Sequence, residues 1–233
     1  MKITYTVLLT ILSNLAVAQF AIIDDKDGYS NVRRTAEAGN NIQDKLENGH
    51  FVYCMEINGN WVNVDYDLKG KDVNNNNSNG FVYKDRLKIV TTFEKVSMVS
   101  KGTNSAVFKN DSIKVTVTSL PFDKTKHRMT YDKESKNFIG EIDGKPCYGT
   151  DGGMPTVEFK AITVMLRDKT MILPKSAIEN LFEAHIGSMQ VNYDKISNTL
   201  YIQASASDGA GSYFVIWRIV NGMYKERYIA YGF

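Results

Sequence analysis

The sequence is poor in features that mark several classes of protein. Its two cysteines, Cys54 and Cys147, do not have the spacing of a disulfide framework. Beyond residue 18 no apolar run approaches the length of a membrane-spanning helix, so we expect no membrane span in the mature chain. The formal net charge is only +2 and the two signs are well mixed, which gives no electrostatic basis for binding nucleic acid.

Motifs for metal binding and for hydrolytic catalysis are also missing. The histidines form no cluster with other ligand residues, and there is neither a His-Glu-x-x-His nor a Gly-x-Ser-x-Gly pattern. We therefore expect no metal, no cofactor and no enzymatic activity.

The composition that is present favours a folded, β-rich protein. A hydrophobic content of 43% argues against disorder. Thirteen tyrosines, eleven phenylalanines and two tryptophans, in a chain with few long helical patterns, indicate β structure.

The first 18 residues have the three parts of a secretion signal. Lys2 supplies the positive start, residues 7–12 and 15–17 form a short apolar core, and Ala16-Val17-Ala18 is a small-x-small cleavage site. We expect a mature chain that begins at Gln19 and is periplasmic or secreted. Export would permit a disulfide between the two cysteines. Because Cys54 alternates with Val52 on the expected inward face, we favour two unpaired thiols.

The next seventy residues carry repeated turn signals. Asn-Gly or Asp-Gly pairs at 27–28, 48–49, 58–59 and 79–80 separate short apolar runs, and such pairs are strong hairpin signals. Residues 61–66 alternate in polarity with period two, as a half-buried strand does. About five short strands at this spacing predict a small barrel.

Four ordered blocks in this region resemble the bacterial SH3-type (SH3b) domain, over residues 21–88. They are residues 28–33 (GYSNVR), Ile42 with 46–49 (LENG), 59–64 (GNWVNV), and 80–83 (GFVY) with Leu87. The chain departs from the family in lacking Gly-Pro after Arg33 and in having a longer loop at 69–79. The resemblance implies a binding domain, commonly for cell-wall peptides or for a neighbouring protein domain.

Exposed aromatic residues are the candidate contacts of such a domain, because they offer amphipathic area at low entropic cost. We select Tyr29, Tyr66 and Tyr83, with the alternative that they fill a small core or its rim. Trp61 is expected to be structural, and Asn31 and Arg33 are expected to stabilise a turn.

The remainder of the chain predicts a second domain at 106–233, after a linker at 89–105. Strand-like segments lie on both sides of one helix, which is expected to begin near Pro174 and to carry Ile178, Leu181 and Phe182 on one face. The fold class predicted for the chain is mainly β, in which an SH3-like small barrel (19–88) is followed by an α+β domain with an antiparallel sheet and one helix.

Two glycine-rich segments, 149–155 and 207–212, each hold an acidic residue. Asp151 and Asp208 could share a cation or form a carboxylate pair, but turns in which Asp caps the backbone are favoured. Together with residues 213–217, these segments are similar to exported bacterial proteins of unknown function.

Three functions follow as hypotheses. The first is an exported, non-enzymatic binding protein of the cell envelope that recognises cell-wall peptide or an envelope protein. The second is a periplasmic immunity or inhibitor protein, with loop 69–79 blocking a toxin or wall hydrolase. The third, a wall-degrading cysteine peptidase with Cys147 and His185, is disfavoured because Cys147 follows Lys145-Pro146 in an expected turn and precedes no helix.

Overall fold

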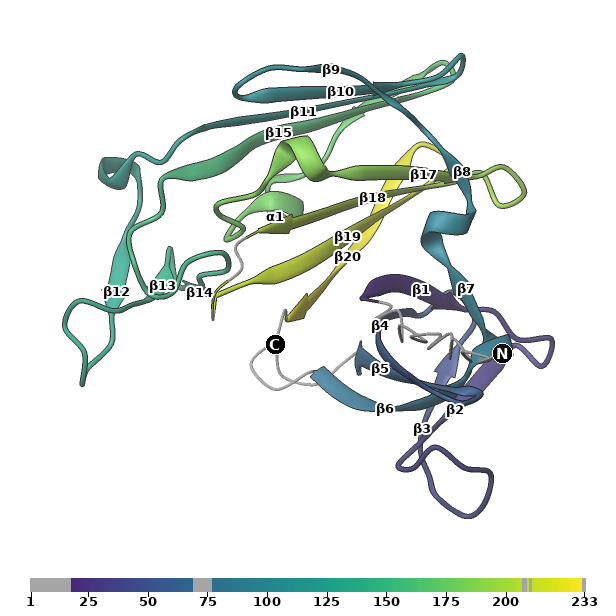
Figure 1. Ribbon diagram of the computed structural model, residues 1–233. Helices are drawn as coiled ribbons and strands as arrows, with labels where there is room; N and C mark the ends of the chain where they lie inside the picture. Colours follow the sequence, from purple (N-terminus) through teal and green to yellow (C-terminus); the bar gives the residue numbers. More distant parts are fainter. Residues whose placement is uncertain (1–17, 69–76, 207–208, 210, 232–233) are drawn as a thin grey trace, which may run out of the picture.

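The computed structural model describes residues 18–68, 77–206, 209 and 211–231. Apart from Ala18, the expected signal peptide lies outside the described residues, as do Asp208 and most of loop 69–79. The described chain is mainly β, as predicted, and its strands form several antiparallel sheets (Figure 1).

The N-terminal sheet has seven strands in the order β3-β2-β6-β5-β4-β1-β7. Their bounds are β1 (Gln19–Ile23), β2 (Tyr29–Arg33), β3 (Ile42–Glu47), β4 (Phe51–Asn58), β5 (Trp61–Asp67), β6 (Asn77–Tyr83) and β7 (Leu87–Ile89). The sheet curls around a core of inward residues that alternate with outward ones, among them Val62, Val64 and Tyr66 of β5 (Figure 1). Its edge strands β3 and β7 do not pair in the described part of the chain. The sheet therefore stays open, and the expected barrel closure is not confirmed.

Two of the Asn-Gly pairs form hairpins as predicted. The expectation of a turn at Asn79-Gly80 was wrong, because these two residues lie within β6 and pair with Asp65 and Val64 of β5. Asn58 pairs with Trp61 across the turn between β4 and β5, and Gly59 has a φ of 62°. Asn221 and Gly222, with φ values of 52° and 77°, join the last two strands of the chain. Both conformations are left-handed, which is why Asn and Gly are favoured there.

Two five-stranded sheets form the C-terminal half, in the orders β16-β15-β11-β10-β9 and β20-β19-β18-β17-β8. A three-stranded sheet, β12-β13-β14, lies at one end (Figure 1). The strands are β8 (Glu94–Lys95), β9 (Met98–Lys101), β10 (Ser105–Lys109), β11 (Ile113–Pro121), β12 (Met129–Tyr131), β13 (Ile139–Ile142), β14 (Lys145–Pro146), β15 (Val157–Leu166), β16 (Lys169–Ile172), β17 (Gln190–Asp194), β18 (Thr199–Ala206), β19 (Tyr213–Val220) and β20 (Met223–Tyr231). Among the described residues, the helical segments are the 3-10 turns η1 (Lys84–Arg86), η2 (Val90–Thr92), η3 (Lys124–Lys126) and η4 (Ile186–Ser188), and the α-helix α1 (Lys175–Ile178).

The main core of this half lies between the two five-stranded sheets. It is built from inward residues of β10, β11 and β15 on one side and of β17, β18 and β19 on the other. The prediction of one sheet packed against a helix was therefore incomplete, because most of the buried face of each five-stranded sheet packs against the other sheet. The segment expected to be a linker contributes β8 and β9 to these sheets.

The expected helix after Pro174 is only one turn long. The backbone leaves the helix at Glu179 and is left-handed at Asn180, with a φ of 59°. The carbonyl of Ala177 accepts hydrogen bonds from Trp217 Nε1 at 2.6 Å and from Arg227 at 3.1 Å, and Arg227 also binds the carbonyl of Glu179 at 3.0 Å. These side chains satisfy carbonyls that further helical turns would otherwise pair. The expectation that Leu181 and Phe182 share a helical face with Ile178 was wrong, because both lie beyond the end of α1 and are buried in two different hydrophobic clusters.

The two halves are joined by a shared aromatic core. Phe20, Phe51 and Tyr53 of the N-terminal sheet pack with Tyr201, Ile216 and Tyr228 of the C-terminal sheet. The rings of Phe51 and Tyr228 are stacked with centroids 6.4 Å apart, and those of Tyr53 and Phe214 are 4.8 Å apart. All six of these residues are buried, so the halves pack as one body across this contact.

Candidate functional site

A groove of about 350 Å³ lies on the outer face of the N-terminal sheet. Three of its lining residues are half-buried aromatics, Tyr29, Trp61 and Tyr83. The others are Asp25, Asp27, Ser30, Asn31, Arg33, Ala38 and Arg86.

Strand parity explains why the three aromatic residues meet. In β2 the buried residues are Ser30 and Val32, so Tyr29 points to the outer face. In β5 the buried residues are the even-numbered ones, which leaves Trp61 outward. Tyr83 of β6 is the direct cross-strand partner of Trp61. Side chains at such positions lie on one face of a sheet and within contact distance.

The aromatic rings are held by specific contacts. Trp61 and Tyr83 meet edge to face, with centroids 5.2 Å apart. The guanidinium of Arg33 lies 5.7 Å from the centre of the Trp61 ring, and the ammonium of Lys45 lies 3.4 Å from that of Tyr29. Both are cation–π distances. The groove is therefore lined by ordered rings with exposed area still available for a ligand.

Charged residues at the rim are engaged by the protein itself. Arg86 forms a 2.6 Å ion pair with Asp25, whose side chain is only 5% exposed. The backbone N–H of Asp27 donates to the same carboxylate at 2.9 Å. Arg33 donates to the carbonyl of Gly39 and to Asn41, and so closes the 34–41 loop. These bonds fix the shape of the groove.

Of the three tyrosines selected from the sequence, the structure brings Tyr29 and Tyr83 together and excludes Tyr66. The expectation that Tyr66 is exposed was wrong: it is fully buried in the core of the N-terminal sheet. Its hydroxyl donates to Asp44 at 2.5 Å and accepts from Gln43 at 2.9 Å, and burial raises the pKa of this phenol. Trp61, which was expected to be structural, is the third aromatic residue that lines the groove.

The two glycine-rich segments lie against each other, with Asp151 as a backbone cap. Its carboxylate accepts a hydrogen bond from the N–H of Gly211, and the N–H of Gly149 donates to the carbonyl of Gly211 at 2.9 Å. A Cβ atom at Gly211 would lie 2.1 Å from the carbonyl oxygen of Thr150, so the close approach requires glycine. Asp208, the other residue of the proposed pair, lies outside the described residues. Among those residues no group of three or more His, Cys, Asp or Glu side chains is arranged to hold a metal ion.

The environment of Cys147 is unlike that of a nucleophilic thiol. Its sulfur contacts the hydroxyl of Thr150 at 3.4 Å, and burial raises the pKa of the thiol. A reactive cysteine needs the opposite shift, toward the thiolate. Both cysteines are free, Cys54 in the N-terminal core and Cys147 beside a separate small cluster in the C-terminal half.

We found no protein-family model, curated protein or solved structure that matches this chain. In the part of the chain that the structure describes, no helix has the length and apolar character needed to cross a membrane.

Proposed function

We propose that the chain is an exported, non-enzymatic binding protein of the cell envelope. In this proposal the N-terminal module is of SH3-like type and binds a cell-wall peptide in the groove lined by Tyr29, Trp61 and Tyr83. The observation that carries the proposal is the convergence of these three rings on one face, from strands that are separate in the sequence. The SH3b-like blocks at residues 28–33, 59–64 and 80–83 support it, since each contributes one of the rings.

The chemistry of the groove suits an extended peptide with apolar side chains. Ordered aromatic rings recognise such segments by stacking, because the rings are already positioned and lose little entropy on binding. The ring faces provide the attraction, while the ion pair of Asp25 and Arg86 borders the groove and fixes its shape. A groove of about 350 Å³ accommodates only a few residues, so we expect recognition of a short segment.

Co-sedimentation with purified insoluble cell wall tests this function. The protein spanning residues 19–233 is expected to bind in a saturable manner and to be released by soluble wall fragments. If the protein stays in the supernatant, wall recognition is rejected. A pull-down from envelope extract would then test the alternative of a protein partner, including a toxin or a wall hydrolase.

A further inference from the structure

A second, larger cavity of about 750 Å³ lies in the C-terminal half, far along the chain from the aromatic groove. Its walls come from the β13–β14 turn, the start of β15 and the segment around α1. The apolar lining consists of Ile142, Phe159, Leu173, Ile178, Leu181 and Phe182. Charged side chains stand around this apolar lining.

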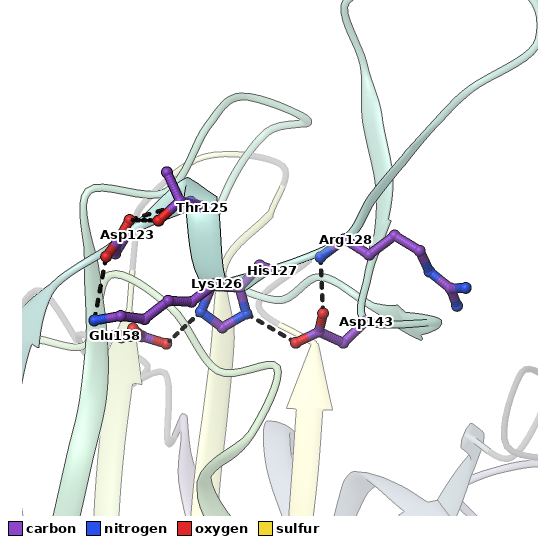
Figure 2. Close-up of polar contacts among 7 residues, drawn as sticks. All are labelled: Asp123, Thr125, Lys126, His127, Arg128, Asp143 and Glu158. Atoms are coloured by element: carbon purple, nitrogen blue, oxygen red, sulfur yellow. Dashed lines mark hydrogen bonds and ion pairs between the residues drawn. The ribbon is translucent and has the colours of Figure 1, made fainter.

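His127 lines one side of the cavity and contacts two carboxylates. Its Nδ1 lies 2.8 Å from a carboxylate oxygen of Asp143, and its Nε2 lies 3.2 Å from one of Glu158 (Figure 2). Phe122 stacks on the imidazole with ring centroids 4.7 Å apart. The imidazole therefore faces a carboxylate at each of its two nitrogens. This arrangement ties both carboxylates to His127.

The remaining acids near the cavity are also paired. Glu179 forms an ion pair with Lys145. Asp143 accepts a hydrogen bond from the backbone N–H of Arg128, and this bond, followed by that from His127, holds the pKa of the Asp143 carboxyl below its usual value (Figure 2). Outside the lining, Asp123 lies 3.2 Å from the ammonium of Lys126. Each carboxylate of the lining thus lies in contact with a histidine or a lysine of the same cavity.

Two lysines that line the cavity differ from these acids in having no partner for the charged group in the described part of the chain. Within the described residues, Lys160 and Lys175 form no ion pair or hydrogen bond through their ammonium groups, although Lys175 is close enough to Asp143 to contribute to its low pKa. Both side chains are exposed at the mouth. The lining thus combines buried apolar side chains with two cationic groups that are available to a ligand.

We propose that this cavity binds a small organic anion with an apolar body, whose anionic group contacts Lys160 and Lys175 and whose apolar part enters between Phe159, Ile178 and Leu181. Charge-assisted hydrogen bonds from ammonium groups to a carboxylate or sulfonate are stronger than neutral ones, and burial of the apolar body adds to them. A cavity of this volume is of the size that accepts such molecules.

The test uses 8-anilinonaphthalene-1-sulfonate, an aromatic sulfonate that fluoresces in apolar surroundings, with the protein of residues 19–233. We expect saturable binding at one site and displacement by decanoate but not by decanol, which has the same chain length and no charge. Replacing Lys160 and Lys175 together by glutamine should weaken binding about tenfold or more, the loss expected for one to two charge-assisted contacts.

Two control variants make the result specific. Exchange of Lys114 and Lys133, which are exposed outside the cavity, for glutamine should leave dye affinity unchanged. The groove variant Tyr29→Ala/Tyr83→Ala should also retain it, so this proposal and the proposed function fail separately. Dye affinity that is equal in the Lys160/Lys175 variant and the native protein, or equal displacement by decanol and decanoate, would overturn the proposal.

Discussion

Replacing Tyr29 and Tyr83 together by alanine is expected to weaken binding to cell-wall fragments roughly 30-fold or more. Aromatic anchors at interfaces commonly contribute about 1–2 kcal/mol each when truncated, and two such losses multiply in the dissociation constant. Both rings are half-buried on the outer face of their sheet, so the variant should still fold. Binding isotherms from co-sedimentation would measure the change, and far-UV circular dichroism would verify the fold.

Two further variants distinguish the loss of groove contacts from a nonspecific effect of removing two tyrosines. Tyr131 and Tyr231 are 46% and 47% exposed and lie outside the groove, so their joint replacement by alanine should leave binding intact. Tyr29→Phe/Tyr83→Phe keeps both ring faces and should retain most of the affinity if stacking is the main interaction. Undiminished binding by the alanine pair would remove these tyrosines from the site.

Phe51→Ala is expected to lower the free energy of unfolding of the whole protein by about 3–5 kcal/mol, the usual range for truncating a core phenylalanine. Phe51 is 4% exposed and belongs to the aromatic core that joins the two halves. The guanidinium of Arg218, from β19, lies 4.1 Å from the centre of its ring and also donates to the carbonyl of Gly49. The substitution therefore removes packing on both sides of the contact.

Urea unfolding followed by circular dichroism and by tryptophan fluorescence would measure this effect. Because the halves share a core, we expect one transition in the native protein, with coincident midpoints from the two probes. Phe138→Ala, at a position that is 46% exposed, is the matched control and should change stability by no more than about 0.5 kcal/mol. A loss at Phe51 as small as that at Phe138, or two separate transitions, would show that the halves are energetically independent.

Local backbone chemistry was predictable from the sequence, whereas the pairing of distant segments was not. Asn58-Gly59 and Asn221-Gly222 form hairpins as expected, and Gly59, Asn221 and Gly222 have the left-handed backbone conformations that these residue types favour. The helix after Pro174 is shorter than its apolar spacing suggested, since Arg227 and Trp217, about 40 to 50 residues later, satisfy its last carbonyls. A pattern of apolar residues does not reveal such partners.

Period-two alternation predicts which face of a strand a residue of the candidate site lies on, but not which strands lie side by side. Val62, Val64 and Tyr66 share one face of β5, so the same alternation that predicted the strand also places Tyr66 inside and Trp61 outside. The prediction that Tyr66 is a ligand contact was wrong for this reason. Tyr29 and Trp61 line the same groove because β2 pairs with β6, through Arg33 and Phe81, and no pattern in the sequence indicates that pairing.

Accessibility of Trp61 to acrylamide, measured with and without soluble cell-wall fragments, tests most directly whether the groove is the binding site. Trp217 is fully buried, so quenching of the native protein reports mainly on the half-buried Trp61. Trp61→Phe keeps an aromatic ring in the groove and serves as the control without the reporter. We expect bound fragments to protect Trp61 from acrylamide, with no corresponding change in the Trp61→Phe variant. Fragments that bind while Trp61 remains as accessible as before would show that the ligand contacts the protein elsewhere.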